Sequence, residues 1–484
     1  MFKDDVRAEV WERIRKQGSR ELQSRLTPGV LKRAARRAGV TLGANPLNCA
    51  VLAWLGIAGA VQTGVEFAVV LTSTLQILAD QSLFRATHLG RVQKTKKSSR
   101  RRGSKHSPKG TDPTVVTEEA YCQARALMPL RFWQELIAVL IEVFESRHHR
   151  QLLFRGFRVL AMDGTEVDLP NWKALRDFFG QAKNKGGKHQ PQARLVMLQL
   201  PFVRLPFRYE LVALAEGENT VARRLAKHLQ PKDLVLLDAG FWSFGLLCDI
   251  QHQGACFALR LKKGLKLQPL PKKLGRDDRL VRWTPCDSRG KWRREGLPKS
   301  IDLRVIRYQI PGYRVQEIVT NVLDPLVIPR AEWVRLTTDC EECGQLRPGL
   351  YHRRWEIETT YRELKVEQGM EQGLRSRTVA SIQYEVASHI VLYLLVRWMM
   401  VEAAESHGLD PLRLSFKQAL TELQSLRHSL IIASPRWAKT LLSRLLERLA
   451  SHVVPYRPGR HYIRRKKSSN YKRKANSPNT QVAS

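Results

Sequence analysis

Acidic residues are scarce in this sequence. Its 484 residues include 45 Asp and Glu against 82 Lys and Arg, which leaves a formal net charge of +37. So basic a surface repels itself, and binding to phosphates relieves the repulsion and releases counterions. Nucleic acid is therefore the expected partner, although an anionic membrane or a ribosomal site would also suit the charge. Hydrophobic residues make up 43% of the chain, enough for the cores of two to four domains.

Cysteine is scarce as well, and a zinc site is not expected. The seven cysteines are odd in number and scattered, which is typical of reduced thiols in a cytosolic compartment. Cys340 and Cys343 form one C-x2-C pair, but no second pair lies at the spacing of a zinc ribbon.

The N-terminus lacks the pattern of a secretory leader, because residues 1–20 are mixed in charge and have no apolar centre. A membrane span over residues 49–78 has to be weighed, since residues 49–65 carry no charge and the apolar run resumes after Glu66. Gln62 and several glycines interrupt this stretch, and no second segment looks membranous. We therefore expect a pair of buried helices there and no membrane partner.

Shifts in composition and hydrophobic period divide the chain into five regions. They are a helical DNA-binding region over 1–115 with a basic linker at 91–115, a first α/β part over 116–262, a β-rich insertion over 263–345, a second α/β part over 346–405 and a helical C-terminal region with a basic tail over 406–484. Nine of the nineteen residues over 91–109 are Lys or Arg, which is typical of a flexible arm that tracks DNA phosphates. A solvated helical extension at the N-terminus and a merely solubilising tail remain the alternatives.

The middle of the chain predicts an α/β fold. Its expected elements are strands at 158–162, 194–200 and 207–215, a helix at 218–229, a strand at 234–238, a helix at 243–251 and a strand at 257–261. Three hairpin-connected strands followed by a βαβ crossover describe a ribonuclease-H-like mixed sheet with helices on both faces. The β-rich insertion interrupts this domain, and helical N- and C-terminal regions flank it.

Two aspartates stand out within this pattern. Asp163 and Asp238 each end a predicted apolar strand, and the ends of neighbouring strands can hold carboxylates side by side. Four other acids lie close by, but not at the C-terminal end of such a strand: Glu166, Asp168, Asp233 and Asp249. An Asp before Gly, such as Asp163, is by itself more often a turn residue.

A third acid, Glu358, lies on the stretch 351–365. This stretch has no Gly or Pro and follows Pro348 and Gly349, so it predicts one helix entered from a turn. At about 100° per residue, the residues on one face are Tyr351, Arg354, Glu358, Tyr361 and Lys365. Those on the opposite, solvent-facing side are His352, Glu356, Glu363 and Glu367. On spacing alone, an amphipathic surface helix with i,i+4 charge pairs is the simpler explanation.

Asp163, Asp238 and Glu358 together suit metal-assisted chemistry on a phosphodiester. Two divalent cations about 4 Å apart can activate a water or a 3′-hydroxyl and stabilise the leaving oxygen. Such hard cations prefer carboxylate oxygens and keep several waters, so two or three acids suffice.

The spacing Tyr351-x2-Arg354-x3-Glu358-x6-Lys365 resembles the Y-R-E-K signature of bacterial DDE transposases of the IS-four family. Residues 160–165 and 236–241 resemble that family's segments around its first and second acids. The β-rich insertion lies between the second acid and the Glu, as it does in the family. The resemblance covers residues 116–404.

This resemblance implies a transposase that acts on double-stranded DNA, both transposon ends and target. The residues implied to bind two Mg²⁺ (or Mn²⁺) are Asp163, Asp238 and Glu358, and those implied to hold phosphates of the transposon end are Tyr351, Arg354 and Lys365. Trp355 could stack on a displaced base or belong to the core. No small-molecule substrate is expected, and the expected location is the bacterial cytoplasm, at the nucleoid.

The implied reaction begins with strand hydrolysis at the terminal inverted repeats of the element. The freed 3′-hydroxyl then attacks the opposite strand to form a hairpin, and hairpin opening and strand transfer follow. The family works as a synaptic dimer that cuts in trans. Two rival hypotheses remain: a catalytically inactive or repurposed DNA-binding protein of the same descent, and a plain metal-dependent nuclease on the same fold.

Overall fold

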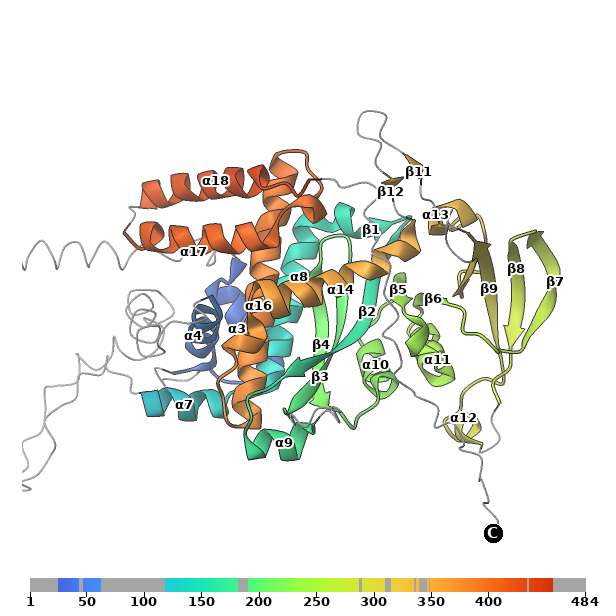
Figure 1. The fold of residues 1–484 in the computed structure, drawn as a ribbon, viewed down its shortest axis with the longest axis horizontal. Helices are drawn as coiled ribbons and strands as arrows, with labels where there is room; N and C mark the ends of the chain where they lie inside the picture. The colour runs from blue at the N-terminus through green and yellow to red at the C-terminus, as the bar shows by residue number, and fades with distance from the viewer. Residues whose placement is uncertain are drawn as a thin grey trace, which may run out of the picture.

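A computed structural model gives the structure of the chain (Figure 1). It describes residues 25–42, 47–61, 118–181, 190–286, 290–309, 315–334, 337–338, 346–347, 349–432 and 435–455. Three features noted in the sequence lie outside the described residues: the basic arm at 91–109, the Cys340 and Cys343 pair, and the basic tail.

Most of the described strands form one mixed sheet of ten strands. Its order is β4-β3-β2-β5-β6-β10-β9-β8-β7, and β1 pairs with β2 beside this path. The pairs β2–β5 and β5–β6 are parallel, while the remaining pairs are antiparallel, so the predicted mixed α/β architecture is confirmed. The strands of the sheet are β1 (Leu153–Phe154), β2 (Phe157–Asp168), β3 (Gln192–Leu200), β4 (Leu205–Ala213), β5 (Asp233–Leu237), β6 (Cys256–Arg260), β7 (Leu267–Gly275), β8 (Asp278–Trp283), β9 (Ile301–Tyr308) and β10 (Gln316–Thr320). A separate ribbon pairs β11 (Thr337–Thr338) with β12 (Leu346–Arg347).

The strands of the β-rich segment lengthen the main sheet. β10 pairs antiparallel with β6, with Ile318 opposite Arg260 and Thr320 opposite Ala258. β9, β8 and β7 follow in turn and form the right-hand end of the molecule in Figure 1. Pairing with β10 satisfies the backbone donors and acceptors along the edge of β6, which would otherwise be a template for another chain.

Helices pack against the sheet and against one another. α8 and α16 contact each other and β4, α10 contacts β3 and β4, and α11 contacts β6. The α-helices are α3 (Pro28–Ala38), α4 (Cys49–Val61), α7 (Glu118–Ala126), α8 (Leu130–Leu152), α9 (Lys173–Phe179), α10 (Glu218–Ala226), α11 (Phe244–His252), α12 (Lys291–Arg294), α13 (Arg330–Val334), α14 (Glu356–Arg362), α15 (Met370–Gly373), α16 (Val379–Ser406), α17 (Phe416–Ile432) and α18 (Pro435–Ser451). Shorter segments are the 3₁₀-helices η2 (Ala239–Phe241), η3 (Leu350–Trp355) and η5 (Pro411–Arg413) and the π-helix η4 (Glu363–Glu367).

α16 is the central helix of the core. It is the one described helix whose length and composition would allow it to cross a membrane, yet 78% of its most apolar window is buried inside the protein. It packs against α4, α8, α17 and α18. Gly56 on α4 permits the close approach, because a Cβ there would lie 2.2 Å from Ser388 Oγ. Tyr384 donates a hydrogen bond to the Leu52 carbonyl, so α4, the first half of the predicted apolar pair, is a buried helix.

Candidate active site

The two aspartates come from adjacent parallel strands. β2 and β5 pair from Arg158 opposite Asp233 to Met162 opposite Leu237, and both aspartates come directly after this last pair. Asp238 follows the end of β5, as predicted. The prediction that Asp163 ends its strand is wrong, because pairing with β3 carries β2 on to Asp168. The register still places both aspartates at the same level on neighbouring strands.

Glu358 lies on a helical stretch in three parts rather than on one α-helix. The 3₁₀-helix η3 leads into α14, and α14 leads into the π-helix η4. The spacing of 100° per residue therefore applies within α14 and fails on either side of it. The prediction of a solvent-facing side is wrong for Glu363, which is 3% exposed, and for Glu356, which pairs with Arg204. Arg204 and Arg397, from distant parts of the chain, cover that side.

Two tyrosines fasten this stretch to the strands that carry the aspartates. The Tyr351 hydroxyl donates to the carbonyl of Leu237, the residue before Asp238, at 2.9 Å. The Tyr361 hydroxyl donates to the carbonyl of Asp163 at 2.6 Å. Burial raises the pKa of both phenols well above the usual range, so each hydroxyl stays protonated and donates. Tyr361 was not predicted as a site residue, although its place on the predicted face was the available signal.

Arg354 lies between the two more exposed acids. Its Nη2 is 3.8 Å from Asp238 Oδ1, and its Nη1 is 3.7 Å from Glu358 Oε1. The arginine side chain is 6% exposed, whereas the side chains of Asp238 and Glu358 are 40% and 41% exposed. Its guanidinium also lies 4.5 Å from the ring centroid of Trp355, a surface side chain and not a core residue. Arg354 thus contacts both carboxylates, and both remain accessible to solvent.

Burial and the neighbouring charges set the pKa of Asp163. Its pKa is raised to about 6, chiefly by burial and further by the charges of Glu358 and Asp238. The Gly164 N–H, which donates to Asp163 Oδ1 at 2.9 Å, and Arg354 act in the opposite direction. The three acids are therefore within electrostatic reach of one another. Within the described residues, Arg354 lies near all three carboxyl groups, and carboxyl groups gathered in this way attract a cation.

Lys365 is engaged at the far end of the helical stretch. Its Nζ donates to the Glu166 carbonyl at 2.5 Å and pairs with Glu371 at 2.9 Å. Glu371 also accepts a hydrogen bond from the Asp168 N–H at 3.1 Å. Lys365 therefore lies beside the last part of β2. No sequence signal indicated Glu371, because the π-helical turn breaks the helical period before it.

The neighbouring acids have other partners. Asp233 accepts two hydrogen bonds from Arg158, at 2.7 and 2.9 Å, and Asp249 pairs with Arg223. Asp168 accepts from Gln192 at 2.6 Å. Asp233 and Asp249 thus form close ion pairs with Arg158 and Arg223, which also pair with Glu145 and Glu295, whereas the nitrogens of Arg354 lie 3.7 and 3.8 Å from Glu358 and Asp238.

The donor chemistry of the cluster fits divalent cations. No three His, Cys, Asp or Glu side chains in the described ranges already enclose a metal position. Asp163, Asp238 and Glu358 nevertheless supply carboxylate oxygens, which Mg²⁺ and Mn²⁺ prefer. A cation there would lie among carboxylates and relieve their mutual repulsion.

Comparisons with known proteins show what the chain is similar to. Residues 155–395 match the family model described as Transposase DDE domain. The chain is 27% identical over 333 residues to the transposase InsG for insertion sequence element IS4 of Escherichia coli (strain K12), an alignment that spans 65% of this chain and 71% of that protein. Among solved structures, the cryo-EM structure of the piggyBac transposase synaptic complex with hairpin DNA aligns with a TM-score of 0.37 and 11% identity, over 94% of this chain and 89% of that chain.

The matched residues include the whole acid cluster, since Asp163, Asp238 and Glu358 all lie within 155–395. The InsG alignment points to the same kind of protein. Over residues 155–395 the chain is thus similar to the transposase DDE domain, and over 333 residues it is similar to the transposase of an insertion sequence.

Proposed function

We propose that the protein is the transposase of its own insertion sequence. It binds the terminal inverted repeats of the element, cleaves the DNA there in a metal-dependent reaction and joins the freed ends to target DNA. The observation that carries this proposal is the register of β2 and β5, which sets Asp163 beside Asp238. Glu358 faces them across Arg354.

The proposed catalytic domain is ribonuclease-H-like. The strand order β4-β3-β2-β5-β6 supports it, because three antiparallel strands are followed by two parallel ones reached through α10 and α11. In that arrangement the central parallel strands end at a common edge, where side chains can meet. Asp163 and Asp238 lie at this edge.

Asp163, Asp238 and Glu358 would hold two Mg²⁺ or Mn²⁺. The bound cations would supply Lewis acidity that lowers the pKa of an attacking water or 3′-hydroxyl and stabilises the leaving oxygen. Tyr351 and Tyr361 keep the helical stretch against the two strands through their bonds to backbone carbonyls. Arg354 limits the repulsion among the acids before the substrate arrives.

Arg354, next to the acids, would hold a DNA phosphate. Lys365 lies further along, beside the end of β2, and would have to leave Glu371 to hold another. A planar guanidinium can bind phosphate through two N–H groups, and Lys acts as a point charge. Tyr351 was predicted to share this role, but its hydroxyl is committed to β5 in the DNA-free protein, so we assign it to positioning. Trp355 is 41% exposed beside Arg354, which suits stacking on a displaced base.

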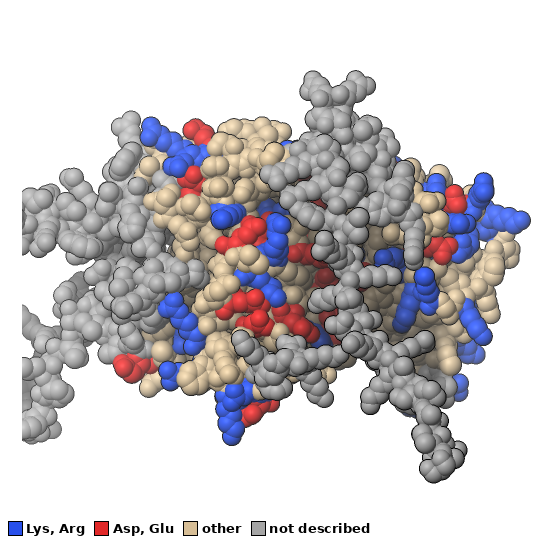
Figure 2. All heavy atoms as spheres, viewed as in Figure 1, with Lys and Arg blue, Asp and Glu red and all other residues tan. Residues whose placement is uncertain are grey.

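The wider surface suits double-stranded DNA. Figure 2 shows acidic side chains gathered in the middle of one face, with Lys and Arg among them. Lys and Arg predominate at the end formed by β7, β8 and β9, which includes the exposed Lys272 and Lys273. Contacts from these Lys and Arg side chains to DNA phosphates would position the DNA without reading its sequence.

Three further parts of the proposal rest on the resemblance to IS-four transposases. They are a hairpin intermediate in the reaction, a synaptic homodimer that cuts in trans and a location at the bacterial nucleoid. Strand transfer would follow hairpin opening, with the freed 3′-hydroxyl as nucleophile.

End cleavage and strand transfer test this function. The substrate is a duplex from the flanks of the gene that contains the terminal inverted repeat, incubated with the full chain and Mg²⁺ or with EDTA. We expect nicking at the repeat and, with pre-cut ends and a plasmid target, joined product. Salt-sensitive binding without cleavage would instead favour a repurposed DNA-binding protein. Cleavage without joining would favour a plain nuclease.

A further inference from the structure

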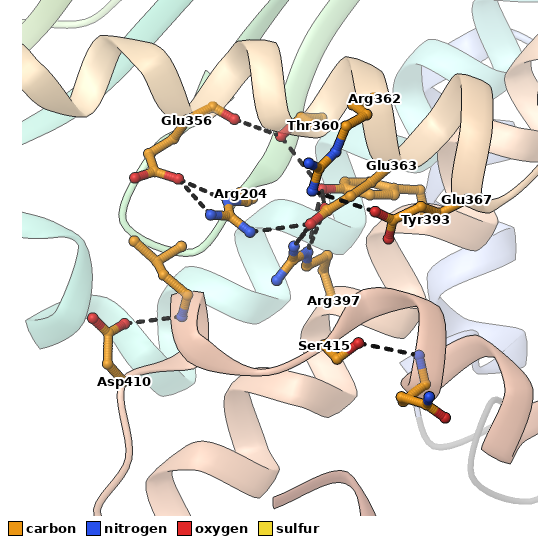
Figure 3. Close-up of polar contacts among 12 residues, drawn as sticks. Arg204, Glu356, Thr360, Arg362, Glu363, Glu367, Tyr393, Arg397, Asp410 and Ser415 are labelled. Atoms are coloured by element: carbon orange, nitrogen blue, oxygen red, sulfur yellow. Dashed lines mark hydrogen bonds and ion pairs between the residues drawn. The ribbon is translucent and has the colours of Figure 1, made fainter. Parts of the chain in front are cut away.

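A second group of charged side chains lies on the other side of the helical stretch (Figure 3). Glu363 accepts hydrogen bonds from Arg204 Nη1 at 3.0 Å, Arg397 Nε at 3.1 Å and the Tyr393 hydroxyl at 2.6 Å. Arg204 also donates to Glu356 at 2.8 Å. We call Glu356, Glu363, Arg204, Arg397 and Tyr393 the buried network.

The buried network is mostly shielded from solvent, and each of its carboxylates meets a guanidinium. The side chains of Glu363 and Arg397 are 4% and 1% exposed, and those of Arg204 and Glu356 are 12% and 17% exposed. Glu356 also lies 3.8 Å from Arg353 Nη1. Burial alone would raise the pKa of Glu363, but Arg397 and Arg204 hold it below the usual value, so this carboxylate is ionised.

Its members join three parts of the fold. Glu356 and Glu363 begin α14 and η4, Arg204 lies in the turn between β3 and β4, and Tyr393 and Arg397 project from α16. Arg204 has a φ of 54°, a left-handed conformation that is uncommon for a residue with a side chain. The turn thus keeps an unfavourable backbone while its side chain contacts both glutamates.

The two glutamates lie on one side of the helical stretch, because seven residues make about two turns. Glu358 follows Glu356 by two residues, about 200° further round the helix, and so points to the opposite side. There the Tyr351 and Tyr361 hydroxyls and the Lys365 ammonium bind backbone carbonyls of the strands at successive points along the stretch. Contacts strung along one side still leave some rotation about the line that joins them. Contacts on the opposite side remove that freedom.

We propose that Glu363, gripped by Arg397 and Arg204, is a positioning residue that sets the rotation of the Glu358 helix toward Asp163 and Asp238. This inference rests on the proposed function of the acid cluster and adds residues outside it. Glu363 follows the last residue of α14 and is the first residue of the π-helical turn η4.

The test is the double variant Glu363→Met/Arg397→Met. Removing one partner would leave an unmatched buried charge and destabilise the protein, whereas removing both keeps the charge balanced. In this variant Arg204 keeps Glu356, and the Tyr393 hydroxyl keeps Thr360 Oγ1 at 3.3 Å. Methionine is unbranched and adapts to the space that remains.

A second buried pair supplies the matched control. Arg304 on β9 donates to both oxygens of Asp278 on β8, at 2.8 and 2.6 Å, and it is 0% exposed. The pair lies in the strands that lengthen the sheet and touches none of the three acids. Asp278→Met/Arg304→Met therefore removes a buried Arg–carboxylate pair from strands that do not position the three acids.

We expect both double variants to fold and to bind inverted-repeat DNA as the parent does. The Glu363→Met/Arg397→Met protein should cleave about 10- to 100-fold more slowly at saturating DNA, since a small misplacement of a reacting group has an effect of that size. Its affinity for Mn²⁺ in the absence of DNA, measured by calorimetry, should also fall. The control should match the parent in both measurements. The single variant Arg397→Lys, which keeps Glu363 and a positive charge, should cleave faster than the Glu363→Met/Arg397→Met protein.

A folded Glu363→Met/Arg397→Met protein that cleaves DNA and binds Mn²⁺ like the control would overturn the inference. If the parent itself binds Mn²⁺ but does not cleave its repeat, the proposed function fails separately. The Mn²⁺ comparison between the two double variants then still decides whether Glu363 positions the acids.

Discussion

The two sides of the Glu358 helix handle charge in opposite ways. On the buried side, Glu356 and Glu363 meet Arg204 and Arg397, and most of their contacts are hydrogen bonds between 2.6 and 3.1 Å. On the open side, three acids share Arg354, whose nitrogens lie 3.7 and 3.8 Å from two of them.

One side of the helix therefore stabilises the fold, and the other side carries the proposed catalytic groups. A matched, desolvated network holds a shape and has no charge left for a ligand. An unmatched and accessible cluster is electrostatically unfavourable by itself, and a cation from solution relieves it. The pKa of Asp163 is raised chiefly by burial, and the charges of Glu358 and Asp238 add to that effect.

Replacing an acid of the open side should have the largest effect. Asp238→Ala should lower end cleavage by about a thousandfold or more, because metal-ion stabilisation of the transition state amounts to several kcal/mol. Binding to the repeat should persist in a gel-shift assay. Asp249→Ala is the control, since Asp249 pairs with Arg223, and it should retain cleavage. Equal losses in the two variants would contradict the assignment.

For stability, replacing an acid of the buried side should have a larger effect than replacing an acid of the open side. Glu363→Gln leaves two guanidiniums with one fewer buried carboxylate and should lower the free energy of unfolding by about 3–5 kcal/mol. Glu358→Gln removes an accessible charge among like charges and should change it by no more than about 0.5 kcal/mol. Urea denaturation of both variants measures the contrast. Similar destabilisation in both would mean that the two sides are not different in kind.

The pH dependence of stability sharpens the same contrast. The pKa of Asp163 is about 6 in the folded protein, raised from 3.8. Between these values the folded state binds more protons than the unfolded state, so the contribution of Asp163 to stability is largest at low pH and falls as the pH rises to about 6. The stability of the parent relative to Asp163→Asn should therefore decrease across this window and then level off. Urea midpoints at several pH values measure it, and a difference that rises with pH would have the wrong sign.

Loosening the helix from its strand should have the smallest effect. Tyr361→Phe removes the hydrogen bond to the Asp163 carbonyl and should lower the free energy of unfolding by about 1 kcal/mol. Thermal unfolding measures the change. Tyr209→Phe is the control, because the buried Tyr209 hydroxyl has no hydrogen-bond partner among the residues that the structure describes, and its removal should not destabilise the protein.

Local sequence patterns predicted which helix and strands carry the site, but they did not predict the contacts that those elements make. The apolar run of β5 located Asp238 at a strand end, and the four-residue spacing located Arg354 and Glu358 on one helical stretch. The extent of β2 was not predictable from its own residues, because its second half is held by pairing with β3.

The buried network escaped prediction for a similar reason. A helical wheel assigned Glu356 and Glu363 to solvent, since it contains no information on Arg204 or Arg397, which lie far away in the sequence. The same wheel assumed one α-helix, whereas the stretch passes through 3₁₀, α and π geometry. Tertiary contacts therefore determine both the helical geometry of this stretch and the partners of its glutamates.

Mg²⁺-dependent cleavage of inverted-repeat DNA by the Glu358→Ala protein, beside the parent, tests the central claim most directly. We expect the parent to nick the repeat and the variant to bind the same DNA without cutting it. Full cleavage by the Glu358→Ala protein would contradict the three-acid site.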